Sequence, residues 1–198
     1  MIHFDNLNQE KPYQIFKSKY DDALDKGQKG IEAVSISSYN KKINEVDSRF
    51  VNLKFVQNDE FIFFSNYNSS KAGSFSSHNQ ISALFFWPSI NVQIRMKAII
   101  KKTSNEYNQR YFSSRSEEKN ALAISSNQSK QIESFSRVKE NFKRSLKKDN
   151  LKKCPKYWGG YTFTPYEIEF WEGSEFRLNK RNFYKKDKDV WSHSILEP

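Results

Sequence analysis

Apolar residues recur along the chain with two different periods, and the two-residue period predicts most of its elements. Between residues 91 and 99 apolar and polar residues alternate strictly, so one face of this segment is expected to be buried in a sheet. Residues 49–56 alternate in the same way, with Val51, Leu53 and Phe55 expected on one face. Further strands are expected at residues 61–64, 81–87, 161–164, 168–171, 181–186 and 190–195.

The second period, of 3.6 residues, predicts four helices between these strands. They are expected at residues 10–25, 70–78, 104–114 and around residues 135–146. The first helix carries its apolar side chains on one face and ends before Gly27 and Gly30; these side chains are Tyr13, Phe16, Tyr20, Ala23 and Leu24. Because the strands mostly follow one another through short turns, the fold class is mainly β: an antiparallel barrel with peripheral helices.

Composition agrees with a folded chain of one domain, or at most two small ones, in 198 residues. An aromatic fraction of 16% is far above that of disordered chains. The single Cys154 cannot form an intrachain disulfide, which favours a reducing compartment. No apolar run resembles a signal peptide or reaches the length of a membrane span, so we expect a soluble, cytoplasmic protein.

The net charge of +10 favours anionic partners. The excess is concentrated in residues 137–156, where nine Lys or Arg residues face only Glu140 and Asp149. This segment could be a nucleic-acid-binding face, but charge runs commonly mark solvated helix surfaces. We therefore favour a solvated helix and expect no nucleic-acid partner.

The sequence lacks the residue patterns that several common types of functional site require. The three histidines, His3, His78 and His193, have no His or Cys partner at ligand spacing, so no metal site is expected. There is no phosphate-binding Walker loop and no dinucleotide fingerprint. The sequence leaves a Ser–His–Asp triad open, but it lacks the glycine pattern of a nucleophile elbow.

What remains is a set of residues suited to phosphate. Arg49 and Lys54 share a predicted strand, and Ser69, Ser70 and Lys71 begin a predicted helix, where free backbone N–H groups favour an anion. Further cations and aromatic surfaces are supplied by Arg115, Arg177, Arg181, Tyr111 and Trp171. This set suits two anionic ligands in one pocket, a phosphorylated cofactor and a phosphorylated substrate. No side chain is an evident nucleophile, so the cofactor would carry the difficult chemistry.

The chain resembles the pyridoxamine 5'-phosphate oxidase family in a series of ordered blocks over roughly residues 10–198. The blocks are residues 49–54, 64–71, 84–88, 91–93, 111–115, 128–129, 158–161, 168–173 and 177–181, followed by the ending 196–198. The resemblance implies an FMN-binding split β-barrel that forms a homodimer with FMN at the subunit interface. It implies a single domain over residues 1–198, with residues 1–30 as a helical arm and residues 158–198 completing the barrel and active site.

The implied reaction is the oxidation of pyridoxamine or pyridoxine 5'-phosphate to pyridoxal 5'-phosphate, by hydride transfer to the flavin N5 with dioxygen as the acceptor. By resemblance, Arg49 and Lys71 hold the FMN phosphate. The other cofactor residues implied are Phe50, Val51, Asn52, Leu53, Lys54, Phe64, Ser65, Ser70, Gln93, Gln128, Ser129, Trp171 and Arg181. Those implied for the substrate are Lys54, Tyr111, Arg115, Lys119, Arg177 and Asn179, of which Arg177 and Asn179 are the catalytic pair.

The chain departs from the family pattern at a few of these positions. Ser70 stands where the family usually has Arg, Lys119 replaces a phosphate-contacting Ser, and Asn179-Lys180 replaces His-Asp. Asn179 can form hydrogen bonds but cannot carry a proton near neutral pH as His can. Two alternatives therefore stand beside the oxidase: a diverged FMN oxidoreductase with another substrate, and a non-catalytic binder of flavin, pyridoxal phosphate or nucleic acid.

Overall fold

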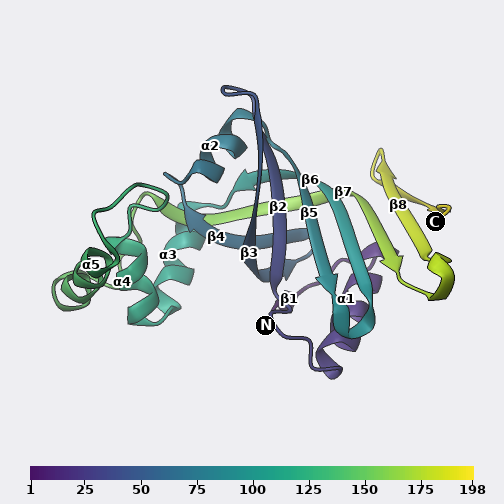
Figure 1. Ribbon diagram of the computed structural model, residues 1–198, viewed down its shortest axis with the longest axis horizontal. Coiled ribbons are helices and arrows are strands. Elements are labelled where there is room, and N and C mark those ends of the chain that lie inside the picture. The colour runs from purple at the N-terminus through teal and green to yellow at the C-terminus, as the bar shows by residue number, and fades with distance from the viewer.

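The computed structural model describes all residues 1–198, which fold around one nine-stranded sheet with five α-helices (Figure 1). The strands are β1 (His3–Asp5), β2 (Ala33–Asn40), β3 (Glu45–Gln57), β4 (Glu60–Asn66), β5 (Gln80–Trp87), β6 (Val92–Lys102), β7 (Trp158–Glu172), β8 (Lys180–Asp187) and β9 (Val190–Ile195). The helices are α1 (Lys11–Asp25), α2 (Ser70–Ser77), α3 (Asn105–Ser114), α4 (Glu117–Ser125) and α5 (Phe135–Lys148), with 3-10 turns η1 (Pro88–Ile90) and η2 (Glu175–Arg177).

The sheet closes on itself because β4 pairs with both β3 and β7. The path β3-β2-β5-β6-β7-β4 is therefore a six-stranded barrel, which β8 and β9 extend as a hairpin from β7. Every pairing is antiparallel except the short contact of β1 with β3. The predicted antiparallel barrel with peripheral helices is confirmed.

The core is aromatic and joins α1 to the barrel. Phe16 of α1 lies 5.1 Å from Phe61 and 5.3 Å from Phe85 between ring centroids. The predicted apolar face of this helix is buried at Tyr13, Phe16, Tyr20 and Ala23, whereas Leu24 is exposed. None of the helices combines the length and apolar character needed to cross a bilayer.

Three elements were not predicted from sequence: the barrel strand β2, the short strand β1 and helix α4. Strand β2 pairs with β3 and β5 and buries Val34, Ile36 and Ser38. It was not predicted because its serine-rich composition is typical of a loop. Strand β1 is too short to show a period, and α4 has only a weak apolar face. The separate strands expected at 161–164 and 168–171 are one strand, β7, because a bulge opposite Lys97 and Ala98 accommodates Pro165 without ending the pairing.

A second bulge corrects the orientation expected for Phe55. The register of β3 against β4 shifts between Leu53 and Phe55, so Val56 joins Leu53 in the core instead. Phe55 turns to the opposite face, where its ring centroid lies 5.4 Å from that of Tyr111. The bulge thus helps to form an aromatic surface outside the barrel.

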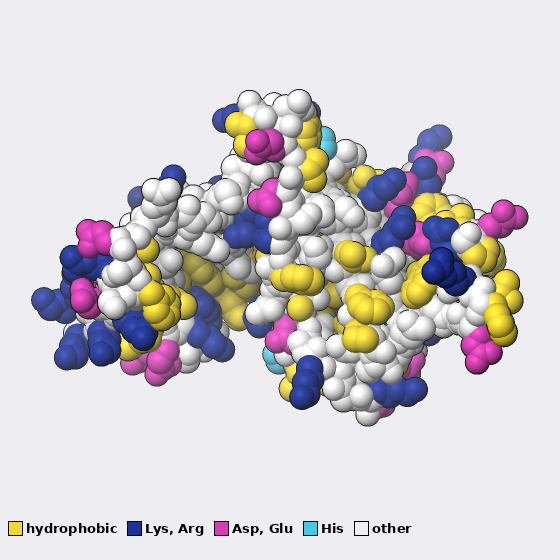
Figure 2. All heavy atoms as spheres, viewed as in Figure 1, with side chains coloured by type: hydrophobic (Ala, Val, Ile, Leu, Met, Phe, Trp, Pro, Cys, Tyr) yellow, Lys and Arg dark blue, Asp and Glu magenta, His cyan; other side chains and the backbone are white.

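Helix α5 forms where it was predicted, at the end of the molecule with α3 and α4 (Figure 1). Its apolar side chains are only partly covered, and Phe135 is 70% exposed. In Figure 2 basic side chains cluster over this end of the molecule. Among its cations only Arg137 forms ion pairs, with Glu133 and Glu140.

The glycines of the Trp158-Gly159-Gly160 block allow α3 to lie against β7. The Gly160 N–H donates to Asn108 Oδ1 at 2.8 Å, and Asn108 Nδ2 donates to the Tyr67 hydroxyl at 3.1 Å. The Tyr67 hydroxyl donates in turn to the Gly160 carbonyl at 3.0 Å. Because these bonds fix α3 against the sheet, they also fix Tyr111 beside Phe64.

Replacing Gly160 with Ala is expected to lower the free energy of unfolding by about 1–3 kcal/mol, the usual cost of overpacking. A Cβ at this position would lie 2.6 Å from Thr103 Oγ1 and 3.2 Å from the Phe64 ring. Gly73→Ala is the matched control, because nothing lies within 4 Å of its Cβ position inside α2. Urea unfolding should show that control to be neutral or stabilised by up to about 1 kcal/mol; equal unfolding free energies for the two variants would contradict the packing argument.

Candidate functional site

A cleft of about 560 Å³ separates the barrel strands β3 and β4 from helices α3 and α4. Figure 2 shows the surface hollowed between the helical end and the barrel, with basic and hydrophobic side chains gathered there. The cleft brings together most of the site residues expected from sequence. Its lining is Phe50, Val51, Asn52, Lys54, Phe64, Ser65, Lys71, Tyr111, Ser114, Arg115, Ser116, Lys119, Gln128 and Trp158.

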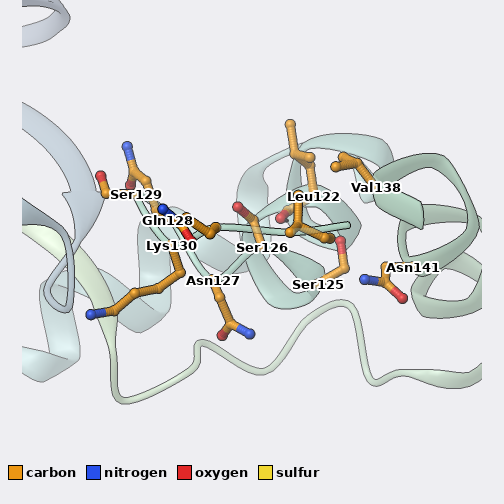
Figure 3. Close-up of a pocket in the computed structure, with 11 residues that line it drawn as sticks. Leu122, Ser125, Ser126, Asn127, Gln128, Ser129, Lys130, Val138 and Asn141 are labelled. Carbon is orange, nitrogen blue, oxygen red and sulfur yellow. Dashed lines mark hydrogen bonds between the residues drawn. The ribbon is translucent and has the colours of Figure 1, made fainter. Parts of the chain in front are cut away.

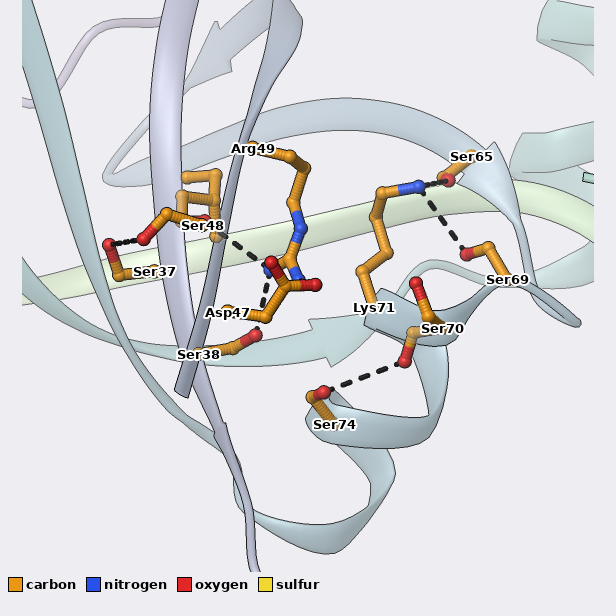
Figure 4. Close-up of polar contacts among 11 residues, drawn as sticks. Ser37, Ser38, Asp47, Ser48, Arg49, Ser65, Ser69, Ser70, Lys71 and Ser74 are labelled. Atoms are coloured by element: carbon orange, nitrogen blue, oxygen red, sulfur yellow. Dashed lines mark hydrogen bonds and ion pairs between the residues drawn. The ribbon is translucent and has the colours of Figure 1, made fainter. Parts of the chain in front are cut away.

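One part of the cleft holds a buried amine without a carboxylate partner. Lys71, in the first turn of α2, is 7% exposed, and its Nζ donates only to Ser65 Oγ at 3.2 Å and Ser69 Oγ at 3.4 Å (Figure 4). Burial lowers the pKa of Lys71, and the nearby Arg49 guanidinium lowers it further, while Asp47 opposes the shift. A desolvated amine beside a second cation is a place where an anion is stabilising.

Arg49 lies next to this amine on β3. Its Nη1 donates to Ser38 Oγ at 2.8 Å and to the Ile36 carbonyl at 3.3 Å, and its Nη2 forms an ion pair with Asp47 (Figure 4). The two bonds to β2 hold the guanidinium in one orientation. Both Nη groups of Arg49 thus have partners within the chain, and the guanidinium adds its positive charge beside Lys71.

The floor of the cleft is a stack of aromatic rings. Phe64 lies 3.9 Å from Tyr111 and 5.2 Å from Trp158 between centroids, with interplanar angles of 20° and 10°. Trp158 belongs to block 158–161 of the family resemblance, but no role in the site was predicted for it. The two glycines that follow it in the sequence are the signal that could have indicated a closely packed site there. The Trp158 ring carries the Arg115 guanidinium, whose Cζ lies 4.5 Å from the ring centroid.

Arg115 follows α3 and supplies a second cationic group. Its Nη2 donates to the Lys119 carbonyl at 3.2 Å, whereas its Nη1 is buried without a hydrogen-bond partner. Burial lowers the pKa of Arg115, and Tyr111 opposes this shift. Lys54 and Lys119 also line the cleft. Arg115, Lys54 and Lys119 thus place three cations on the lining of one cleft, which favours a second anionic group there.

Gln128 and Ser129 lie at the border of a further cavity. This cavity, of about 280 Å³, lies between α4, residues 126–132 and α5 (Figure 3). Gln128 lines both the cleft and this cavity, and its Oε1 accepts from the Asn66 N–H at 3.4 Å. Ser129, which has a positive φ of 69°, lines only the cavity. Ser70, Leu53 and Arg49 are not among the residues that line the cleft: Ser70 is exposed, Leu53 is buried in the core, and Arg49 lies behind the lining, beside Lys71.

A second group of expected site residues lies away from the cleft. Gln93, Trp171 and Arg181 are directly opposite one another on β6, β7 and β8 and form a row across the sheet. Figure 1 shows β8 and α3–α5 at opposite ends of the molecule. The structure therefore brings the expected residues together in two groups and does not join these groups within one chain.

Arg177 and Asn179 belong to the second group and lie between β7 and β8. Arg177 is exposed and makes no hydrogen bond or ion pair, and both it and Phe176 have positive φ angles, of 61° and 55°. Asn179 Oδ1 accepts from the Ser174 N–H at 3.3 Å, which closes the loop. Positive φ at two consecutive non-glycine residues is an uncommon conformation that is often found at functional sites.

No group of three or more His, Cys, Asp or Glu side chains is placed to hold a metal ion. Burial raises the pKa of the Cys154 thiol to about 11, and its Sγ contacts the carbonyls of Pro155 and Trp158. The thiol is therefore protonated and a poor nucleophile at neutral pH. The side chains that the cleft offers to a ligand are mainly cations and aromatic rings.

Comparison with known proteins gives consistent results. A family model described as "Pyridoxine 5'-phosphate oxidase C-terminal dimerisation region" matches residues 158–198. A relative from Legionella pneumophila (strain Lens), named pyridoxine/pyridoxamine 5'-phosphate oxidase, is 34% identical over 94% of this chain and 87% of its own length. A relative from Hydrogenovibrio crunogenus, named pyridoxine/pyridoxamine 5'-phosphate oxidase 1, is 32% identical over 96% of this chain and 89% of its own length.

Two solved structures share the fold. PhzG from Burkholderia lata 383, in complex with tetrahydrophenazine-1-carboxylic acid, has a TM-score of 0.89 at 21% identity and covers 95% of this chain and 93% of its own. A pyridoxamine 5'-phosphate oxidase-related, FMN binding protein from Nostoc punctiforme PCC 73102 has a TM-score of 0.78 at 11% identity, with coverages of 96% and 99%. These likenesses extend over nearly the whole barrel.

Inorganic phosphate is expected to stabilise the protein through Lys71. Phosphate at about 100 times its Kd should raise the unfolding free energy by about 2.7 kcal/mol, and Lys71→Met should remove most of this gain. Without phosphate the variant should be at least as stable as the wild type, because methionine fills the space with no charge to desolvate. Thermal melts at increasing phosphate concentration test this, with the exposed Lys101→Met as the charge control. An unchanged phosphate response in Lys71→Met would contradict the assignment.

Proposed function

Because this chain belongs to the pyridoxine/pyridoxamine 5'-phosphate oxidase family, with which it aligns over nearly its whole length, we propose that it shares the reaction of that family. In this reaction pyridoxamine or pyridoxine 5'-phosphate is oxidised to pyridoxal 5'-phosphate, with dioxygen as the acceptor. As a member of this family the chain is an oxidoreductase and its cofactor is FMN. The observation that carries the proposal is a cleft with two cationic groups beside an aromatic floor. That arrangement matches a phosphorylated cofactor and a phosphorylated aromatic substrate.

The residues of the cleft fit FMN. Lys71 is a buried amine that lacks an anionic partner, and Arg49 is fixed beside it, so together they suit a terminal phosphate. The rest of the cofactor would be lined by Phe50, Val51, Asn52, Lys54, Ser65 and Gln128. Bound FMN supplies the two-electron acceptor, and the remaining tasks of binding and orientation belong to the side chains of the chain.

The second cationic group would hold the substrate phosphate. Arg115, Lys54 and Lys119 all line the cleft and supply its positive charge. Burial raises the pKa of Tyr111, so its hydroxyl stays protonated at neutral pH and can donate a hydrogen bond to a phosphate oxygen. Holding the phosphate at one end orients the reacting carbon, which is one way in which a binding site raises the rate.

We propose that two copies of the chain form a homodimer and that each site uses both of them. Trp158 and Trp171 lie near opposite ends of β7, and thirteen residues at about 3.3 Å each place them roughly 40 Å apart along the strand. One flavin cannot reach both ends, so Gln93, Trp171 and Arg181 of one subunit would contact the FMN held by the cleft of the other. Arg177 and Asn179 would cover the substrate from the same side. Each chain, residues 1–198, would act as a single domain in the cytoplasm.

A second candidate is an oxidoreductase of the same fold that acts on a different anionic aromatic substrate. Asn179, where the family has His, is engaged with the Ser174 N–H, and Lys119 adds a charge to the cleft in place of a neutral Ser. These side chains alter the surroundings of the substrate and leave Arg49 and Lys71 unchanged. An FMN-loaded protein that oxidised neither phosphorylated vitamer at saturating concentration would favour this candidate over the proposed reaction.

Turnover tests the proposal directly. The FMN-loaded wild type should form pyridoxal 5'-phosphate from pyridoxine 5'-phosphate with release of hydrogen peroxide, both followed by absorbance. Arg177→Ala should bind FMN as the wild type does but lose turnover by about 100-fold, because misplacing a substrate by about 1 Å has that effect. Lys180→Ala removes a nearby exposed cation and is the control. Full turnover by Arg177→Ala would exclude Arg177 from the site.

Mixing two inactive variants tests whether the site is shared. Lys71→Met and Arg181→Ala homodimers should each bind FMN weakly. A heterodimer of the two, isolated through different affinity tags, should contain one site with both wild-type residues and one with neither. FMN titration should therefore recover a single tight site per heterodimer. If both residues served the same chain's site, no tight site would appear, and light scattering of an FMN-loaded monomer would contradict the dimer.

A further inference from the structure

Arg181, on strand β8, forms hydrogen bonds with Glu169, Leu196 and Glu197. Its Nε donates to Glu169 Oε1 at 2.8 Å, and its Nη1 donates to the Glu197 carbonyl at 2.8 Å. Its own carbonyl accepts from the Leu196 N–H at 3.0 Å. The side chain of Arg181 is only 23% exposed. Two groups of the guanidinium are therefore fixed, and Nη2 is left with no protein partner.

Glu169 is the centre of this arrangement. Its charged side chain is only 4% exposed. Each carboxylate oxygen forms an ion pair with one arginine: Oε1 with Arg181 Nε, and Oε2 with Arg95 Nη2 at 3.2 Å. A buried carboxylate is tolerated where its charge is paired and its oxygens are hydrogen-bonded. Since Glu169 lies on β7 and Arg181 on the neighbouring β8, the pair also fixes the guanidinium relative to Trp171.

The residues after β9 complete the set. Leu196 and Glu197 return alongside β8 and contact Arg181 only through their backbone groups, while the Glu197 side chain is exposed and unpaired. The ending 196–198 was one of the blocks that resemble the family, but none of its residues lines the cleft. Its contacts instead converge on one side chain of the second group.

We propose that Glu169 and the backbone of Leu196–Glu197 are positioning residues for Arg181: they fix its guanidinium so that Nη2 is presented to the FMN of the partner subunit. This inference rests on the proposed function, in which Arg181 contacts that cofactor. Without Glu169, the Arg95 and Arg181 guanidinium groups would face a neutral side chain and each other. Without residues 196–198, Nη1 would lose its acceptor, and the guanidinium would be free to adopt other orientations.

Binding of FMN to the full-length dimer, measured by quenching of flavin fluorescence, tests the proposal. Arg181→Ala should weaken FMN binding at least about tenfold, the effect of losing one hydrogen bond to a charged group. Glu169→Gln, and a chain that ends at Ile195, should each weaken it by a similar factor. Glu197→Ala should bind as the wild type does, because only its carbonyl is used. The melting temperature of each FMN-free variant shows whether it folds.

A double-mutant comparison separates positioning from general damage. In the Arg181→Ala background, Glu169→Gln and the truncation should have almost no further effect on FMN binding, because there is no guanidinium left to position. Full additivity, or wild-type FMN binding by both the truncated chain and Glu169→Gln, would overturn the inference and leave the proposed function intact. If Arg181→Ala bound FMN as the wild type does, both the inference and the role proposed for Arg181 would fall. Absence of FMN binding by the wild type would refute the cofactor site itself.

Discussion

Strand β7 is the constraint on which the arrangement of this molecule depends. It pairs with β4 over its first half, with β8 over its second half and with β6 along most of its length, so it belongs to the barrel and to the outer hairpin at once. Gly159 and Gly160 near its start admit α3, and Glu169 and Trp171 near its end face β8. Because an extended chain of this length cannot fold back on itself within a sheet, the two ends stay apart, and a site that uses both needs two copies of the chain.

The cations of the two groups differ in what neutralises them. Lys71 and Arg115 are desolvated and have no carboxylate partner, which leaves their positive charge without a paired counter-charge in the chain. Arg181 is paired with a buried carboxylate, which fixes where it points and leaves one nitrogen unpaired. The first kind of environment binds charge, and the second orients a donor. The net charge of +10 gives no information on either environment, because much of that charge lies on the exposed cations around α5.

In the loop between β7 and β8 the chain departs from the family pattern at Asn179, as it does at Lys180, the first residue of β8. Asn179 uses its side-chain oxygen to accept the Ser174 N–H, and the loop carries two consecutive residues with positive φ. The loop is therefore closed by a side chain that does not titrate near neutral pH, and Arg177 is exposed on it.

The sequence by itself determined the local elements and the residue types of the site. Strict alternation at residues 91–99 predicted β6, and the cationic and aromatic blocks carried the family resemblance, because period and composition are properties of neighbouring residues. It did not determine the course of β7 through Pro165 or the orientation of Phe55, since a bulge is defined by the register of one strand against its partner and not by either strand alone. Only the tertiary structure placed Arg115 over Trp158 and Glu169 against Arg181, and only it separated the site residues into two groups. Those relations join residues far apart in sequence, and the pairing of strands, which no local pattern encodes, decides their distance.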